Sequence, residues 1–180
     1  MGRLTGCGRA VLAPAVLAIV LAIGPARLGE TAPPPRYGPF ASPPLDGPLV
    51  VRSGFGDARS NHFHAGFDFS TGERVGRPVL APLAGSVVRV RTSGVGYGRS
   101  LYLATGDGRL LVFGHLDAFA GPLAAYVAAA QESTAQYEQD LWPAAGRFRF
   151  ATGERIAWSG ESGAGPPHLH LEVRRGDTVL

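Results

Sequence analysis

Glycine and proline divide most of this sequence into short segments, and that spacing limits what the chain can fold into. The 180 residues include 26 Gly and 15 Pro, and turn signals at 94–98, 106–108 and 163–167 separate short apolar runs. Short runs between turn residues are typical of β-strands, and strands at this spacing predict an antiparallel sandwich or a partly closed barrel. The strands are expected at 49–52, 63–69, 78–81, 86–91, 100–105, 110–115, 155–159 and 169–174.

One segment departs from this pattern and predicts a helix. Between 122 and 141 the sequence is rich in Ala, Gln and Glu, and apolar residues recur at helical spacing until Pro143. These apolar residues are Leu123, Tyr126, Val127, Ala130, Tyr137 and Leu141. The expected fold class is therefore mainly β with one helical insertion.

The amino terminus has the features of an export signal. Arg3 and Arg9 form a short basic region, an apolar run extends from Ala10 to Ile23, and small residues follow up to Ala26. The run is shorter than the roughly 20 residues that a membrane-spanning helix needs. Residues 1–26 are therefore expected to be a signal peptide, with an uncleaved membrane anchor as the alternative. Either interpretation places the domain outside the cytoplasmic membrane, in the periplasm, the cell envelope or the extracellular space.

The next segment is rich in proline and predicts a linker. Residues 27–48 contain seven of the 15 Pro, a composition typical of an extended chain without a core of its own. The folded domain is then expected at 49–180.

The net charge argues against a polyanionic partner. The chain carries 17 basic residues and 14 acidic ones, but removal of residues 1–26 takes away Arg3 and Arg9 and no acid, which leaves a charge of only +1. We therefore expect no nucleic acid partner, and membrane contact only through an uncleaved amino-terminal segment. The chain has one Cys, so an internal disulfide and a CxxC-type zinc site are excluded. Any metal chemistry must use His, Asp and Glu.

Two of the predicted strands combine an apolar face with a face of chemically active side chains. Side chains alternate across a strand, so residues two apart share a face. In the first strand we expect the aromatic residues to face the core and His64 and Asp68 to share the opposite face. In the second, His168, His170 and Glu172 lie opposite an apolar set. The apolar sets are Phe63, Ala65, Phe67 and Phe69 in the first strand, and Leu169, Leu171 and Val173 in the second.

These side chains could form a catalytic zinc site if the two strands are neighbours. Catalytic zinc takes three protein ligands through nitrogen or oxygen and keeps a fourth position for water. His64, Asp68 and His170 supply such a set. The sequence has no H-E-x-x-H helix, so a base for the water must come from His115, at the end of another strand, or from His168. One of these could take the proton while the other stabilises the developing oxyanion.

The remaining polar residues, and other types of active site, have alternative interpretations. Glu172 could orient a ligand imidazole or be a solvated charge, and His62 is expected to be exposed or to line the site without binding metal. A cupin-like metal barrel would need a Glu soon after the first His pair, and Asp68 is a poor substitute. A serine hydrolase is not supported, because the segment at 160–164 lacks the second Gly of a nucleophile elbow.

The motifs taken together resemble those of the lysostaphin-type zinc endopeptidases, which are cell-wall hydrolases that cut peptide bonds in peptidoglycan. The resemblance extends in order from about Phe55 to Arg174. It is carried by His64-Ala65-Gly66-Phe67-Asp68-Phe69, Gly85-Ser86-Val87-Val88, Gly96-Tyr97-Gly98, Gly114-His115-Leu116, Gly153-Glu154-Arg155-Ile156 and Gly165-Pro166-Pro167-His168-Leu169-His170-Leu171-Glu172.

The resemblance implies an antiparallel β fold of the duplicated-hybrid-motif type with a groove. It implies one Zn²⁺ bound by His64, Asp68 and His170, and catalytic roles for His115 and His168. It also adds the substrate, a peptidoglycan peptide, so the expected function is that of an exported zinc metalloendopeptidase.

Two points of the resemblance leave alternatives open. The interval 117–152 is longer than is usual in the family, and this insertion could wall the groove, dock a protein partner, autoinhibit the enzyme or be a surface excursion. The alternative function is that of a non-catalytic protein with the same fold that binds the cell wall or regulates a hydrolase. Family members that act as activators tend to lack ligand residues, whereas this chain retains them.

Overall fold

Antiparallel β-structure makes up most of the described chain. The computed structural model describes residues 1–2, 37–163 and 165–180, and residues Tyr37–Leu180 form one compact unit. The predicted export signal lies, except for its first two residues, outside the described residues. The strands are β1 (Val51–Ser53), β2 (Phe67–Ser70), β3 (Pro78–Leu80), β4 (Gly85–Thr92), β5 (Arg99–Thr105), β6 (Leu110–Phe119), β7 (Gln139–Leu141), β8 (Arg149–Phe150), β9 (Arg155–Ser159), β10 (His168–Arg175) and β11 (Thr178–Val179). The helix α1 spans Gly121–Thr134.

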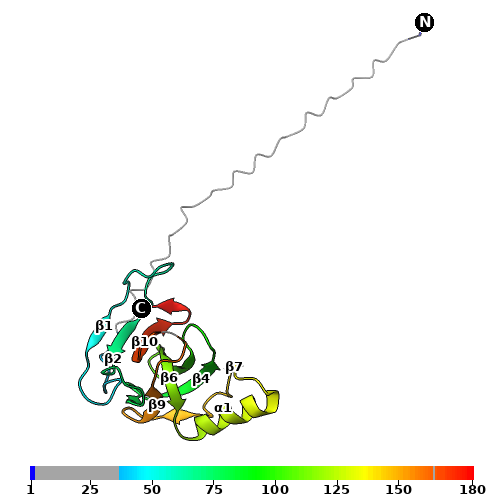
Figure 1. The fold of residues 1–180 in the computed structure, drawn as a ribbon. Helices are drawn as coiled ribbons and strands as arrows, with labels where there is room; N and C mark the ends of the chain where they lie inside the picture. Colours follow the sequence, from blue (N-terminus) through cyan, green and yellow to red (C-terminus); the bar gives the residue numbers. More distant parts are fainter. Residues whose placement is uncertain (3–36, 164) are drawn as a thin grey trace. The chain divides into compact units, whose positions relative to one another are not determined.

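The strands pair in one sheet whose main order is β1-β2-β10-β6-β5-β4-β7 (Figure 1). β9 joins β6 to β3, while β8 pairs with β4 and β11 with β10. Every one of these pairings is antiparallel, and the sheet does not close into a barrel. The predicted class, mainly antiparallel β with one helical insertion, is confirmed. The order brings β2 and β10, the two strands with alternating polar residues, side by side.

The core lies on the central strands and on the helix that packs against them. Its fully buried members include Val87, Leu101, Leu103, Leu111, Phe113, Leu116, Leu123, Ile156 and Leu169. The prediction that the aromatic residues of the first strand face the core was wrong for Phe63 and Phe67, which are 74% and 45% exposed. Phe63 precedes β2, and the neighbour of β2 towards the edge of the sheet is β1, which has only three residues. The sheet therefore leaves the side chains of Phe63 and Phe67 partly exposed to solvent.

The second half of the proline-rich segment packs against the domain. Leu45 is fully buried in the core, and Phe40 packs against it. The backbone amide of Leu80 donates to the Pro44 carbonyl at 2.9 Å, and that of Asp46 donates to Pro78 at 3.1 Å. The compact unit thus begins at Tyr37 rather than near Leu49. Proline removes amide donors but leaves carbonyl acceptors, so such a segment can still bind to a neighbouring strand.

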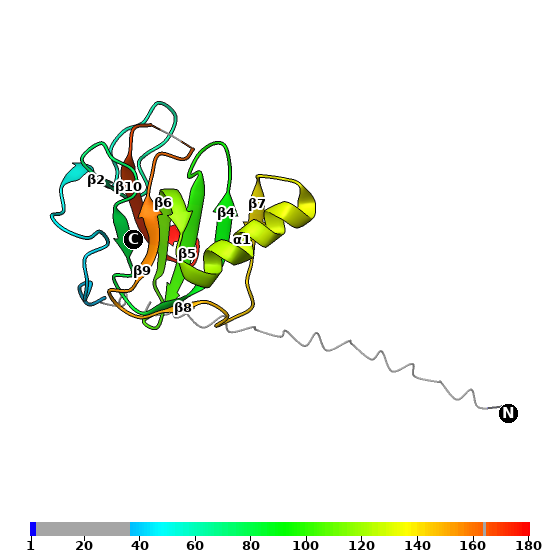
Figure 2. The ribbon, with the colours of Figure 1, turned by 60° about the horizontal axis from the view of Figure 1, so that its bottom comes forward.

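The insertion contains a helix and two added strands, β7 and β8, which both pair with β4. Pro122 lies in the first turn of α1, where its missing amide proton costs nothing, and Leu123 and Val127 bury the inner face. The predicted helix was too long, because α1 ends at Thr134 and the next residue, Ala135, adopts a left-handed conformation. The segment Gln139–Leu141 then pairs with the edge of β4 as β7. Figure 2 shows α1 at the side of the sheet that carries β4 and β7.

None of the helices in the described part of the chain is long and apolar enough to cross a membrane.

The position of Leu45 generates a prediction about where the folded unit begins. Leu45→Ala removes a fully buried side chain and is expected to lower the free energy of unfolding by about 2–5 kcal/mol in urea denaturation. Leu49→Ala, at a position that is 43% exposed, is the matched control and should cost less than about 1 kcal/mol. Equal small effects would place the start of the unit after residue 48.

Candidate metal centre

Three buried side chains that are far apart in sequence meet at one point of the sheet. The Asp68 Oδ1 atom lies 3.0 Å from His64 Nε2 and 2.9 Å from His170 Nδ1, and the two histidine nitrogens are 3.0 Å apart. Asp68 of β2 and His170 of β10 are directly opposite each other in the ladder, and His64 lies in the loop three residues before β2 begins. The structure thus brings together the three residues that the sequence predicts as metal ligands.

Gly66 explains why these ligands have their spacing. An added Cβ at this position would lie 2.4 Å from the Leu171 carbonyl oxygen, a distance that no side chain could occupy. The absence of a side chain lets the segment after His64 lie directly against β10. This close approach places His64 on the same side of the sheet as Asp68 and His170.

Hydrogen bonds behind the cluster determine which atoms face into it. His64 Nδ1 donates to the Gly54 carbonyl at 2.7 Å, and His170 Nε2 donates to the Glu172 carboxylate at 2.9 Å. The single N–H group of each neutral imidazole therefore donates to a partner outside the cluster, and the nitrogen that faces the cluster carries a lone pair. Arg59 Nη2 donates to the outer oxygen of Asp68 at 2.9 Å, which leaves Oδ1 free to face the two nitrogens.

Three electron-pair donors that face one another require a cation between them. Nitrogen and oxygen are donors that zinc accepts, and zinc at about 2.0–2.2 Å from each ligand separates tetrahedral ligands by roughly 3.3 Å. The observed separations of 2.9–3.0 Å are close to that value. Because the three donors lie on one side, a fourth position opens towards a cavity of about 510 Å³. The residues present therefore fit a catalytic zinc ion.

The charges of the cluster are strongly perturbed. Burial alone would raise the pKa of Asp68, but its hydrogen bond with His170 and the nearby charges of His168, His170 and His64 lower that pKa to about 2. For His170, burial opposes the charged form, yet the hydrogen bonds to Asp68 and Glu172 raise its pKa. Asp68 and Glu172 thus favour the protonated form of the His170 imidazole.

Glu172 holds one of the converging residues, His170, through a buried hydrogen bond. Its side chain is fully buried, and its carboxylate accepts hydrogen bonds from His170, from Arg174 and from the Tyr97 hydroxyl. Burial raises the pKa of this carboxyl, but these three partners outweigh burial and lower it. Of the two interpretations that the sequence left open, the solvated surface charge was wrong.

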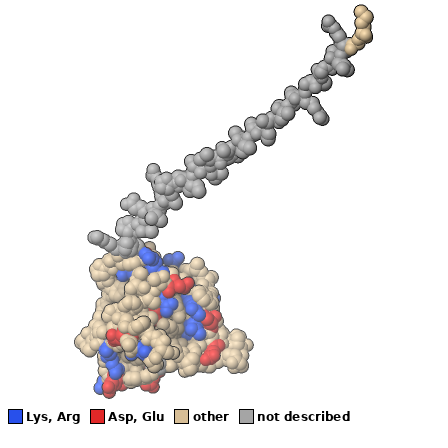
Figure 3. Space-filling model, turned by 90° about the horizontal axis from the view of Figure 1, so that it is seen from above, with Lys and Arg blue, Asp and Glu red and all other residues tan. Residues whose placement is uncertain are grey.

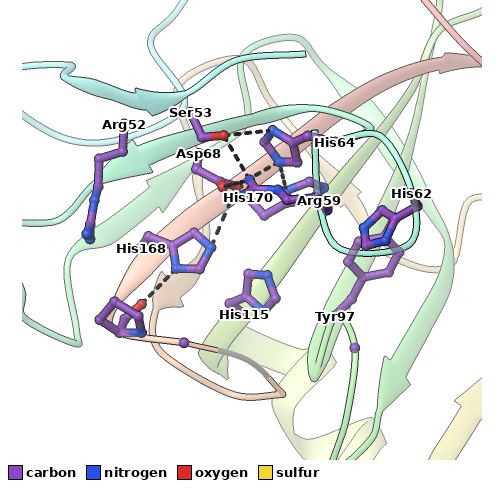
Figure 4. A pocket seen from close by; sticks show the side chains of 13 residues that line it. Arg52, Ser53, Arg59, His62, His64, Asp68, Tyr97, His115, His168 and His170 are labelled. Carbon is purple, nitrogen blue, oxygen red and sulfur yellow. Dashed lines mark hydrogen bonds and ion pairs between the residues drawn. The ribbon is translucent and has the colours of Figure 1, made fainter. Parts of the chain in front are cut away.

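His115 and His168 lie side by side next to the three converging residues (Figure 4). Their ring centroids are 4.5 Å apart, and the ring of His115 lies 5.8 Å from that of His170. His115 Nδ1 donates to the Ser162 carbonyl at 2.9 Å, and His168 Nδ1 donates to the Pro166 carbonyl at 2.7 Å. Each ring therefore has an unprotonated Nε2 atom when it is neutral.

The backbone of His115 is held in an uncommon conformation. Its φ angle is +58°, in the left-handed region, within the long strand β6. The amide of His115 donates to the Tyr97 carbonyl at 2.9 Å, so the pairing with β10 ends at Gly114 and the side chain turns towards the pocket. Burial and the neighbouring charges of His168 and His170, opposed by the bond to Ser162 and the charge of Asp68, lower the pKa of His115 to about 4.

The pocket also contains residues that sequence reasoning did not assign. Tyr97 stacks on His170 with ring centroids 5.2 Å apart, and the only sequence signal for it was the Gly-Tyr-Gly motif. Arg52, Ser53 and Arg59 line the pocket from β1 and the following loop, and no spacing pattern marked them. His62 lines the pocket too, but outside the three converging residues, as the sequence predicts.

Two glycine-rich loops form one wall of the site. An added Cβ at Gly98 would lie 2.2 Å from the Ser162 carbonyl oxygen, and Gly98 has a φ angle of +58°. Ser162 also accepts a hydrogen bond from the Arg99 amide through its hydroxyl and donates one to the Leu116 carbonyl. This packing fixes the carbonyl that orients His115.

Figure 3 shows the charged residues on one face of the molecule. On the face drawn in Figure 3, arginine and acidic side chains are interspersed.

Several solved structures share this fold. The chain matches a zinc-containing peptidase from Vibrio cholerae with a TM-score of 0.56 and 24% identity, over 79% of this chain and 39% of that one. It matches the catalytic domain of a mutant of the prophage-encoded M23 protein EnpA from Enterococcus faecalis with a TM-score of 0.54 and 21% identity, over 77% and 92%. The catalytic domain of the antimicrobial peptidase lysostaphin from Staphylococcus simulans matches with a TM-score of 0.51 and 22% identity, over 73% and 87%.

The chain has the lysostaphin-type fold. At these identities the likeness establishes the fold, which agrees with the resemblance in the sequence motifs. No protein-family model matches the sequence, and no curated protein matches it significantly. Within the lysostaphin-type fold of this chain, the converging residues lie on β2, on β10 and in the loop before β2.

The loop packing gives a prediction about the wall of the site. Gly98→Ala places a methyl group against the Ser162 backbone and forces a left-handed residue, so the free energy of unfolding should fall by at least about 1–3 kcal/mol. Gly94→Ala, in the same loop with open space around it, should change it by less than about 0.5 kcal/mol. If urea denaturation gives equal values for both variants, the described contact between the loops is wrong.

His115 gives a prediction about pH. Its pKa is lowered from 6.5 to about 4, so between these values the unfolded chain binds more protons at this site than the folded chain. The stability that neutral His115 contributes is complete above pH 6.5 and is lost as the pH falls towards 4. In chelator-treated protein, the free energy of unfolding should depend less steeply on pH in this window for His115→Gln than for the wild type. Parallel curves would contradict the assignment.

Proposed function

We propose that this chain is a zinc-dependent endopeptidase that hydrolyses peptide bonds in peptidoglycan. The observation that carries the proposal is the convergence of three lone-pair donors, from His64, Asp68 and His170, beside two further imidazoles in an open cavity. The lysostaphin-type fold supports it, because solved structures with this fold include peptidases. The motifs of the sequence indicate the same substrate class.

His64, Asp68 and His170 would hold the metal. Zinc, when bound, supplies a Lewis acid that lowers the pKa of a water molecule to about 7 and polarises a carbonyl group. The protein contributes the orientation of the ligands through the Gly54 carbonyl, Glu172 and Arg59. Such partners keep each ligand in the correct protonation state.

The two other histidines have different surroundings, and these suggest different roles. His168 Nε2 lies 3.6 Å from Asp68 Oδ1, so this nitrogen faces the point where the attacking water would be bound. His168 is therefore assigned as the general base that accepts the proton of the attacking water and later donates it to the leaving amine. Burial keeps His115 neutral, so its Nε2 accepts a hydrogen bond and positions the water or the substrate amide.

This assignment changes the role that the sequence suggested for the second histidine. A neutral His115 whose Nδ1 proton is bound to Ser162 has no proton on Nε2, so it cannot donate a hydrogen bond to an oxyanion. Orientation of the nucleophile is the role that its tautomer permits.

Export is part of the same proposal. Peptidoglycan lies outside the cytoplasmic membrane, and the basic and apolar pattern of residues 1–26 is that of a segment that directs export.

Digestion of purified peptidoglycan tests the proposed function. The zinc-loaded protein should release soluble fragments with newly formed amino and carboxyl termini, which mass spectrometry identifies, and a chelator should abolish their release. His168→Ala should lower the rate by about 10²–10⁴-fold. His62→Ala, which changes a histidine outside the proposed machinery, is the matched control. Absence of new termini with the zinc-loaded wild type would contradict the proposal and favour a regulatory protein.

A further inference from the structure

Arg52 provides a positive charge in the pocket that the described structure does not neutralise. It lies on β1, its side chain is exposed, and it extends along the pocket on the side of His168 (Figure 4). Within the described ranges 37–163 and 165–180, no carboxylate lies within ion-pair distance of its guanidinium. Arg59, the other arginine of the pocket, donates instead to Asp68 and to the Ser53 hydroxyl.

The charge balance of the pocket makes this arginine significant. Asp68 is the one carboxylate among the described residues that line the pocket, and Arg59 and the histidines already surround it. Glu172, behind the ligands, is paired with Arg174. A zinc ion would add two further positive charges. The pocket therefore has an excess of positive charge, which favours a ligand with a negative group.

The chemistry of arginine narrows the kind of negative group. Its planar guanidinium presents parallel donors that match the two oxygens of a carboxylate, and a free arginine can make both bonds without losing another partner. Arg52 is adjacent to Ser53, whose hydroxyl lies 3.3 Å from the ring of His64. Arg52 lines the same pocket as the candidate metal centre, so a group that it binds lies in the cavity where the peptide bond would be cut.

We propose that the substrate peptide carries a free carboxylate next to the bond that is cut, and that Arg52 binds this carboxylate. The proposal rests on the proposed peptidase function and specifies its substrate class. An acidic peptide is then preferred to one without a nearby carboxylate, such as an internal oligoglycine segment. The carboxylate can belong to a side chain or to the chain terminus, since both present the same two oxygens.

The test compares peptidoglycan with and without its negative charges. Purified peptidoglycan is used untreated and after its carboxylates are amidated with a carbodiimide and ammonia. The wild-type zinc enzyme should cleave the untreated material roughly 10- to 100-fold more efficiently. Arg52→Gln should lose this preference, through KM more than kcat, while Arg52→Lys keeps part of it. Arg175→Gln, which removes an exposed arginine beyond the pocket lining, is the control for net charge and should keep the full preference.

Two synthetic versions of the cleaved peptide then distinguish the sources of the carboxylate. One version has a side-chain carboxylate and a carboxyl-terminal amide, and the other has the reverse. Preference of the wild type for one version, lost in Arg52→Gln, identifies the group that Arg52 binds.

The outcomes separate the inference from the function on which it rests. If the wild type cleaves neither form of peptidoglycan, the proposed function fails. If it cleaves both forms equally, or if Arg52→Gln keeps the preference, the peptidase function stands and the role of Arg52 is overturned.

Discussion

The outward hydrogen bonds of three ligands are the constraint on which the rest of the site depends. The Gly54 carbonyl accepts a hydrogen bond from His64, the Glu172 carboxylate accepts one from His170, and Arg59 donates to one oxygen of Asp68. Three lone pairs are thereby forced to face one another about 3 Å apart in a buried place, which is unfavourable unless a cation lies between them. We propose that a zinc ion meets this need. The fold can thus be understood as the scaffold that keeps these lone pairs together.

The sheet meets this demand through a few local departures from regular structure. Gly66 allows the loop before β2 to lie against β10, and the left-handed His115 turns a side chain of β6 towards the pocket. Both departures occur beside the candidate metal centre. The insertion extends the sheet beyond β4, where β7 pairs with that strand. Its Glu138 accepts hydrogen bonds from the loop that leads to Tyr97.

Much of the fold and of the site could be predicted from the sequence, and the failures have physical causes. Strand alternation placed His168, His170 and Glu172 on one face, because β10 is long and regular. The alternation rule placed Phe63 in the core wrongly, because β2 begins only at Phe67 and Phe63 lies in the loop before it. The sequence pattern alone does not reveal where a strand begins. The roles of Arg59 and of the Gly54 carbonyl depend on contacts between segments, and neither residue has a periodic neighbour that would mark it. The packing of residues 37–48 was missed for a similar reason, since Phe40 and Leu45 are separated by prolines and show no strand or helix periodicity.

X-ray absorption spectroscopy at the zinc edge, on protein with one equivalent of zinc, tests the central claim most directly. The account predicts one tightly bound zinc per chain, with two imidazole nitrogens and one carboxylate oxygen from the protein at about 2.0–2.2 Å. In Asp68→Ala and His170→Ala this signature should disappear together with tight binding. Zinc bound equally well by these variants, or a spectrum with a different set of protein ligands, would contradict the account.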